Sequence, residues 1–239
     1  MKGLSISGKL MIRNVLLDLD DTLFDFSYAE RIALSKTLEH IGVMPKETIL
    51  KRYSELNLKH WEMLERGEIT REQVKVNRYK ALFLEFAIDA SPEYATNYYE
   101  DSLGKGHYFI VGAEELLKEL IKQYRLYLVS NGSLSVQRGR IASSGIGKYF
   151  SKIFISQEVG FDKPSAEFFR TCFLEIPNFK KEETIIVGDS LTSDIQGGIN
   201  VGIKTVWFNP KKKKNISNII ADYEINKLLE LIEILKHFN

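Results

Sequence analysis

Three aspartates stand close together directly after a short apolar run near the start of the chain. Asp18, Asp20 and Asp21 follow the apolar segment 12–17, and Thr22 comes next. Carboxylates at this spacing repel one another, so proteins keep such a cluster mainly where a cation neutralises it or a proton is shared. In a strand, Asp18 and Asp20 point to the same side. The cluster indicates a site that works through carboxylates, with an acidic capping turn as the simpler alternative.

Three further segments carry groups that complement this cluster. The run Ser130–Gly132 offers a hydroxyl and tight backbone before a predicted helix, which suits a phosphate. Lys163 precedes Pro164, which we predict to be the first residue of a helix. Asp189 and Asp194 follow another apolar run. Each segment alone is typical of a helix cap or a surface lysine. Together they predict a hard-cation site facing a phosphate cradle.

The elements that must position these residues follow an α/β rhythm. Strands are predicted at 12–17, 125–129, 152–155, 184–187 and 204–207. From the second strand onward they alternate with helices predicted at 113–123, 134–144, 165–175 and 191–200, and a last helix is predicted at 225–237. We therefore expect a Rossmann-like, doubly wound parallel sheet formed by residues 11–24 and 106–239. Its carboxyl edge would collect all four polar segments.

Between the first two strands the rhythm breaks. Residues 27–103 contain long amphipathic stretches and no strand pattern, so we predict an inserted, all-helical cap domain at 25–105. One predicted helix face is formed by Ile49, Tyr53, Leu56, His60 and Leu64, and Gly67 is placed to end that helix. The insertion leaves directly after the first strand, so it should lie over the edge where such sheets bind ligands.

Composition favours an ordinary soluble globular protein, in which any anionic ligand would be held by a local site. The 239 residues are 44% hydrophobic, and 33 basic against 32 acidic residues leave a net charge of +1, so nothing attracts nucleic acid or a membrane globally. We interpret Lys211–Lys214 as a solvated loop. The only cysteine, Cys172, excludes an intramolecular disulfide and is expected to pack in the core. Residues 1–10 are interpreted as a leader without signal-peptide character, and a cytoplasmic location is expected.

The four segments resemble the four motifs of the haloacid dehalogenase superfamily, in the expected order. The matching sequences are DLDDT from Asp18, SNG from Ser130, the lysine of FDKP and GDSLTSD from Gly188. The resemblance extends over the whole chain from about Met11, and a helical cap inserted after the first motif is also a pattern of that superfamily. It implies a phosphomonoester as the ligand and Mg²⁺ as the cofactor.

The resemblance also implies roles for individual residues. Asp18 would attack phosphorus and form an aspartyl-phosphate, and Asp20 would protonate the leaving oxygen and then activate water. Protein ligands of Mg²⁺ would be the Asp18 carboxylate, the Asp20 carbonyl and Asp189, with Asp194 holding a metal-bound water or orienting Lys163. The phosphoryl oxygens would be bound by Thr22, Ser130, Lys163 and the backbone amides of Asn131 and Gly132.

Other activities of the superfamily, and one other class, compete with this interpretation. Dehalogenases also use the first aspartate as nucleophile but typically lack the second, so Asp20 favours a phosphatase. A transporting ATPase would need apolar runs that span a membrane, and a phosphonate-cleaving enzyme would need a cap lysine that forms a Schiff base. Receiver-type signalling modules combine an acidic cluster, a hydroxyl and a lysine, but without the DxDxT spacing and without an insertion of this size.

The cap is expected to select the substrate. The runs LDDTLFDFSYAE, GDSLTSDIQGG and TVWFNP resemble a bacterial subfamily of pyrimidine nucleoside 5′-monophosphatases that remove noncanonical nucleotides. That resemblance implies that Trp61 or Phe26 stacks on a base, and that Asn57 or Arg78 reads its edge or a sugar hydroxyl. The alternative for each of these residues is a place in the core of the cap. Sugar phosphates are the main alternative substrates.

Overall fold

A parallel sheet forms the centre of the molecule. The computed structural model describes residues 11–238, so the predicted leader at 1–10 lies outside the described residues. Within that range six strands form one parallel sheet in the order β3-β2-β1-β4-β5-β6. The strands are β1 (Asn14–Leu17), β2 (Arg125–Ser130), β3 (Lys152–Ile155), β4 (Thr184–Gly188), β5 (Lys204–Phe208) and β6 (Tyr223–Ile225). The predicted doubly wound, Rossmann-like sheet is confirmed.

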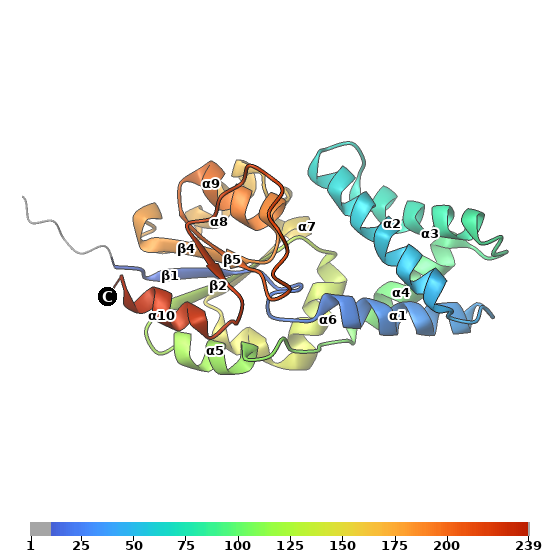
Figure 1. Ribbon diagram of the computed structural model, residues 1–239, viewed down its shortest axis with the longest axis horizontal. Coiled ribbons are helices and arrows are strands. Elements are labelled where there is room, and N and C mark those ends of the chain that lie inside the picture. Colours follow the sequence, from blue (N-terminus) through green and yellow to red (C-terminus); the bar gives the residue numbers. More distant parts are fainter. Residues whose placement is uncertain (1–10, 239) are drawn as a thin grey trace, which may run out of the picture.

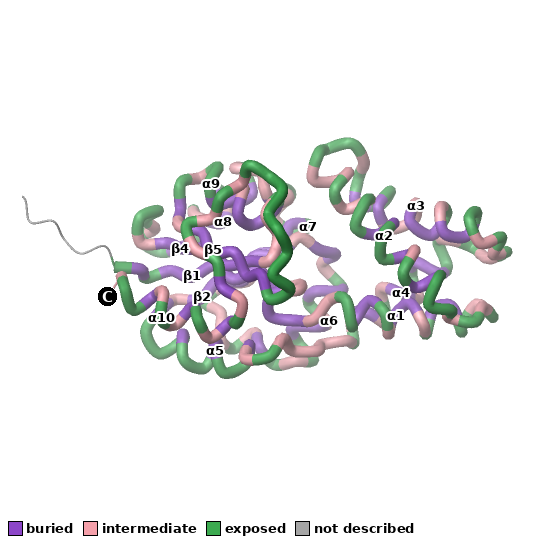
Figure 2. The backbone as a smooth tube through the Cα atoms, viewed as in Figure 1, coloured by how far each residue is buried: buried purple, intermediate pink, exposed green. Residues whose placement is uncertain are grey.

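Side chains of the central strand alternate between two apolar cores. Val15 and Leu17 of β1 pack into one core, whereas Leu16 packs into the other. The first core is covered by α5 (Ala113–Leu120) and α10 (Glu230–Lys236), and the second by α8 (Ala166–Leu174) and α9 (Gln196–Val201). Figure 1 shows these helices on opposite sides of the strands, and Figure 2 shows the strands buried between them. Cys172 packs in the second core, as predicted.

Other helices connect the strands of this core. They are α6 (Leu134–Ser144), α7 (Ser156–Val159), the 3₁₀ turns η1 (Ile146–Tyr149) and η2 (Lys181–Glu183), and the π-helical turn η3 (Leu191–Ile195). The helix predicted at 191–200 thus begins with a π turn before α9. Pro164 is not the first residue of a helix, because Ser165 accepts a hydrogen bond from the Glu167 N–H and caps α8 instead.

The end of the chain differs from the prediction. The helix expected at 225–237 is preceded by β6, which pairs with β5 and includes Ile225. Helix α10 begins only at Glu230, whose side chain accepts hydrogen bonds from the backbone N–H groups of Asn226 and Lys227. The short strand was missed because its three residues, Tyr-Glu-Ile, are too few for their alternation to be distinguished from a helix start.

The insertion consists of four helices with an apolar core of their own. They are α1 (Phe26–His40), α2 (Glu47–Glu65), α3 (Arg71–Glu85) and α4 (Pro92–Gly104). Ile49, Tyr53 and Leu56 of the predicted face of α2 are buried in that core, and Gly67 follows the helix end with a φ of 72° that favours glycine. Figure 1 shows the four helices together beyond the carboxyl ends of the strands. None of the helices within residues 11–238 has the length and apolar character needed to cross a bilayer.

Candidate functional site

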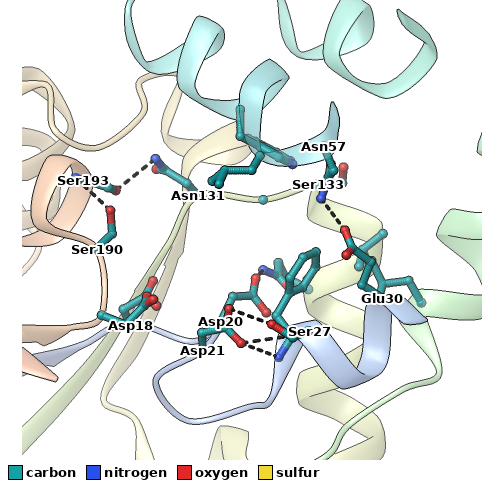
Figure 3. Close-up of a pocket in the computed structure, with 18 of the residues that line it drawn as sticks. Asp18, Asp20, Asp21, Ser27, Glu30, Asn57, Asn131, Ser133, Ser190 and Ser193 are labelled. Atoms are coloured by element: carbon teal, nitrogen blue, oxygen red, sulfur yellow. Dashed lines mark hydrogen bonds between the residues drawn. The ribbon is translucent and has the colours of Figure 1, made fainter. Parts of the chain in front are cut away.

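The polar segments meet at the carboxyl edge of the sheet. β1 lies between β2 and β4, so the residues that follow these strands are neighbours in space. A cavity of about 410 Å³ lies between this edge and the cap helices. Asp18 and Asp20 line it from the core, and Glu30 and Asn57 line it from α1 and α2 (Figure 3).

Lys163 is buried and bridges two of the carboxylates. Its Nζ donates to Asp18 Oδ1 at 2.6 Å, to Asp194 Oδ1 at 2.6 Å and to the Val129 carbonyl at 2.9 Å, so all three of its protons are used. Burial lowers the pKa of Lys163, but the charges of Asp18 and Asp194 outweigh burial and raise it overall. Lys163 therefore stays charged and fixes the Asp18 side chain.

The surroundings of Asp18 disfavour the ionised form of its carboxyl group. Burial raises its pKa to about 7, with Lys163 opposing and Asp194 adding to the rise. Burial likewise raises the pKa of Asp189 well above its ordinary value, and the charge of Asp18 adds to that rise. A cation between these groups would remove both penalties.

The geometry fits a small hard cation. Carboxylate oxygens of Asp18, Asp189 and Asp194 all lie within 4.8 Å of one another. Gly188 permits this approach, because a Cβ at that position would stand 2.1 Å from Asp194 Oδ2. All-oxygen donors of this kind are the ligands that Mg²⁺ prefers. The predicted metal ligands Asp18 and Asp189 are thus brought together, with Asp194 beside them.

The other two aspartates of the first motif have different surroundings. Asp20 accepts hydrogen bonds from the side chains of Gln137, at 2.6 Å, and Arg140. Asp21 also lines the cavity, and its carboxylate accepts the backbone N–H of Phe26 at 3.0 Å. The acidic turn therefore combines both interpretations of the sequence, since Asp18 and Asp20 face the cavity while Asp21 supports the start of α1.

Only some of the residues predicted to bind the phosphoryl group line the cavity. Asn131 and Gly132 line the cavity, whereas the buried side chains of Thr22 and Ser130 are not among its lining residues. The Thr22 hydroxyl accepts the backbone N–H of Asp189 at 3.2 Å and so joins the first and fourth motifs. Asn131 exchanges two hydrogen bonds of 2.8 Å with the backbone of Lys163. These hydroxyl and amide side chains hold the loops in place.

The predicted cap residues also reach the cavity, but two of them are already paired. Asn57 donates to Glu30 Oε1 at 2.6 Å, and Arg78 donates to Asn57 Oδ1 at 2.6 Å. Arg78 is buried, with its guanidinium 4.8 Å from the centre of the Tyr99 ring. Phe26 and Trp61 line the cavity and are half-buried. A chain of polar contacts, Glu30–Asn57–Arg78, therefore forms part of the cap wall.

Several lining residues were missed by the reading of the sequence. Gln137 and Arg140 lie on the buried face of α6, where a polar residue at apolar helix spacing was the available signal. Glu30 is buried in the same way on α1. Lys211 and Lys213 lie in an exposed loop, as predicted, and they also line the cavity, which the sequence did not indicate.

Four polar contacts join the cap to the core around the cavity. Arg71 of α3 pairs with Asp162 and donates to Ser156. Ser133 donates to Glu100 of α4 at 2.8 Å. Thr192 donates to Glu65 of α2 at 3.1 Å. Side chains of both units thus hold the cap against the core beside the cavity.

Comparison with known proteins identifies the class. A family model described as haloacid dehalogenase-like hydrolase matches residues 15–208, which include all four motifs. The chain therefore belongs to the haloacid dehalogenase-like hydrolases and is an enzyme of that family. The resemblance drawn from the motifs is confirmed.

Particular relatives narrow this class further. The chain is 40% identical over 223 residues to the HAD-hydrolase YfnB of Bacillus subtilis, which covers 93% of this chain and 95% of YfnB. It is 36% identical over 222 residues to the pyrimidine 5′-nucleotidase PynA of Streptococcus pneumoniae, covering 92% of this chain and 94% of PynA. A crystal structure of YfnB bound to magnesium matches with a TM-score of 0.90 at 40% identity, covering 94% of this chain and 99% of that one.

Proposed function

We propose that this protein is a Mg²⁺-dependent phosphomonoester hydrolase in which Asp18 is the covalent nucleophile. The observation that carries the proposal is the buried Asp18 carboxylate, fixed by Lys163 and placed beside Asp189 and Asp194 at a cavity. The magnesium bound to YfnB supports the choice of ion. We assign Asp18, Asp189 and the Asp20 carbonyl as its protein ligands, with Asp194 in support.

The reaction follows from the chemistry of these side chains. An oxygen of Asp18 attacks phosphorus in line, and the bond to the leaving oxygen breaks as the aspartyl-phosphate forms. Asp20 gives its proton to the leaving oxygen and then takes one from the water that hydrolyses the aspartyl-phosphate. Bound Mg²⁺ would neutralise the crowded carboxylates and the phosphoryl oxygens. The amides of Asn131 and Gly132 would bind the phosphoryl oxygens from the core side.

We further propose that residues 25–105 act as the cap and that the substrate is a pyrimidine nucleoside 5′-monophosphate. The name of PynA supports this choice, because that relative is similar to nearly the whole chain. The cap wall offers the exposed faces of Phe26 and Trp61 for stacking and the Glu30–Asn57–Arg78 chain for polar contacts. Both kinds of contact suit a flat heterocycle that carries hydrogen-bonding groups.

A phosphate-release panel tests the proposal. Uridine and thymidine 5′-monophosphates are compared with purine nucleotides and hexose phosphates, each with magnesium or with EDTA. We expect hydrolysis only with magnesium and the highest kcat/KM for the pyrimidine nucleotides. Activity that survives EDTA would contradict the metal-dependent mechanism. Equal or better hydrolysis of hexose phosphates would replace the substrate by a sugar phosphate and leave the chemistry intact. A long-lived phospho-Asp18 without turnover would instead indicate a signalling module.

A further inference from the structure

Arg140 is a charged side chain in an unusual place. It lies on α6 and has 0% of its surface exposed, although arginine is rarely buried completely unless it is paired. Its partner is the carboxylate of Asp20, which its Nη1 contacts at Oδ1. Asp20 keeps 26% of its side chain exposed and lines the cavity. A buried cation therefore holds a carboxylate that faces the ligand site.

The guanidinium is itself held from several directions. Its Nε donates to the Gly106 carbonyl at 2.9 Å, in the segment that returns from the cap to the core. Its Nη1 also donates to Gln137 Oε1 at 3.1 Å. The ring of Phe24 lies against it, with the guanidinium carbon 5.2 Å from the ring centre. These contacts leave the planar group one orientation, which a flexible ammonium would not reproduce.

Gln137 supplies a second donor to the same carboxylate. Its Nε2 donates to Asp20 Oδ2 at 2.6 Å and to the Ser130 hydroxyl at 2.9 Å. The tight fit of this amide explains Gly132, because a Cβ there would stand 2.6 Å from Gln137 Nε2. Each oxygen of Asp20 thus has its own donor. Two donors on two oxygens fix both the direction and the rotation of the carboxyl group.

We propose that Arg140, with Gln137, is a positioning residue that holds the Asp20 carboxyl group where it serves the leaving oxygen. The inference rests on the proposed phosphatase chemistry. The competing account is that the pair only stabilises the fold. A fold-stabilising pair would affect every substrate alike, whereas a pair that positions Asp20 would matter most where the leaving oxygen needs a proton.

Two esters separate these accounts. The leaving oxygen of uridine 5′-monophosphate is an alkoxide that must be protonated, whereas 4-nitrophenyl phosphate releases a stable aryl oxide. For Arg140→Met we expect kcat/KM for the nucleotide to fall about 100-fold and for the aryl ester less than about 5-fold. Arg138→Met is the matched control, because Arg138 lies on the same helix with an exposed side chain paired to Glu158, and it should leave both values unchanged.

A second variant and a double mutant complete the test. Gln137→Met keeps the buried charge paired and should show the same selective loss, smaller in size, so the test does not depend on the folding of Arg140→Met. When Asp20→Asn is already present, adding Arg140→Met should lower kcat/KM by less than about a further 3-fold, because Arg140 acts through Asp20. Equal losses for both esters in these variants, or additive losses in the double mutant, would overturn the inference. An inactive Asp18→Asn in the same experiment would show that the proposed function still holds. Full activity of Asp18→Asn would overturn both.

Discussion

The two walls of the cavity are built on different principles. The core wall places Lys163 in direct contact with Asp18 and Asp194, and the three residues come from segments that follow β3, β1 and β4. The cap wall joins Glu30, Asn57 and Arg78 through residues of three different helices. The core wall concentrates charge that a cation and a phosphate can neutralise, whereas the cap wall satisfies its own charges by hydrogen bonds.

This difference suggests that the core wall carries out the reaction and the cap wall selects the substrate. The core carboxylates are left with raised pKa values because burial is not fully offset, which favours binding of a cation. On the cap side, burial also raises the pKa of Glu30, but the donors Ser54 and Asn57, one on each oxygen, and the charge of Arg78 oppose that rise. Because the polar groups of the cap wall already pair with one another, this wall should affect substrate binding mainly through its shape and a few hydrogen bonds. Substitutions there should therefore change the preference among substrates more than the rate of the chemical step.

Loss of the nucleophile should give the largest effect. We expect Asp18→Asn to lower kcat at least about 10⁴-fold on every ester, because an amide cannot form the acyl-phosphate. Asp25→Asn is the matched control, since Asp25 caps α1 by accepting the Tyr28 N–H and asparagine caps a helix equally well. Phosphate release measures both. Retained activity in Asp18→Asn would contradict the assignment of the reaction to the core wall, because the nucleophile would then lie elsewhere.

A substitution in the cap wall should act on selection instead. Glu30→Gln replaces one acceptor oxygen by a donor, so Ser54 or Asn57 loses its partner and the Asn57–Arg78 contact shifts. We expect kcat/KM to fall about 10-fold for uridine 5′-monophosphate and less than 2-fold for ribose 5-phosphate, which has no base; tenfold corresponds to about 1.4 kcal/mol.

The control for that substitution lies on the same helix. Glu39→Gln changes an exposed glutamate of α1 and should leave both substrates unaffected. Equal losses on the nucleotide and the ribose ester in Glu30→Gln would show that the cap wall supports catalysis rather than selection.

The same contrast explains how much the sequence predicted. Asp18, Lys163, Asp189 and Asp194 were predicted to converge because each follows a strand of a parallel sheet, so topology alone brings them together. The pairing of Glu30 with Asn57 and of Asp20 with Arg140 depends on helix packing across 27 and 120 positions of sequence. Helix periodicity reports that a residue is buried but not what it meets. The spacing on α6 could therefore indicate that Arg140 is buried, but not that it pairs with Asp20.

A smaller effect is expected on stability from the crowded carboxylates. Burial and the charge of Asp18 raise the pKa of Asp189, so its ionised form opposes folding when no cation is bound. Asp189→Asn should raise the melting temperature of the metal-free protein by about 3 °C, which corresponds to about 1 kcal/mol in a chain of this size. Magnesium should stabilise the wild type but not this variant. Thermal unfolding with magnesium or EDTA checks both, and a lower metal-free melting temperature would contradict the assigned repulsion.

The smallest predicted effect concerns the seam between the two walls. Glu65 of α2 accepts a hydrogen bond from Thr192, and burial raises its pKa from 4.5 to about 7, with Asp194 adding to the rise. Because the folded pKa lies above the unfolded one, the protonated form supplies stability that is complete below pH 4.5 and is lost as pH rises through 7. Glu65→Gln should therefore raise the melting temperature by about 1 to 2 °C at pH 8 and leave it unchanged at pH 4.5.

A neighbouring glutamate makes this small effect measurable. Glu62 lies one turn earlier on α2 and is exposed, and its charge is the smallest of the named causes of the raised Glu65 pKa. Glu62→Gln should therefore raise the melting temperature at pH 8 by less than Glu65→Gln does, and leave it unchanged at pH 4.5. A gain in Glu65→Gln that is equal at pH 4.5 and pH 8 would mean that the carboxyl group is not desolvated at the seam. A gain confined to high pH would show that the Glu65 carboxyl group, buried where the cap meets the core, resists ionisation in the folded protein.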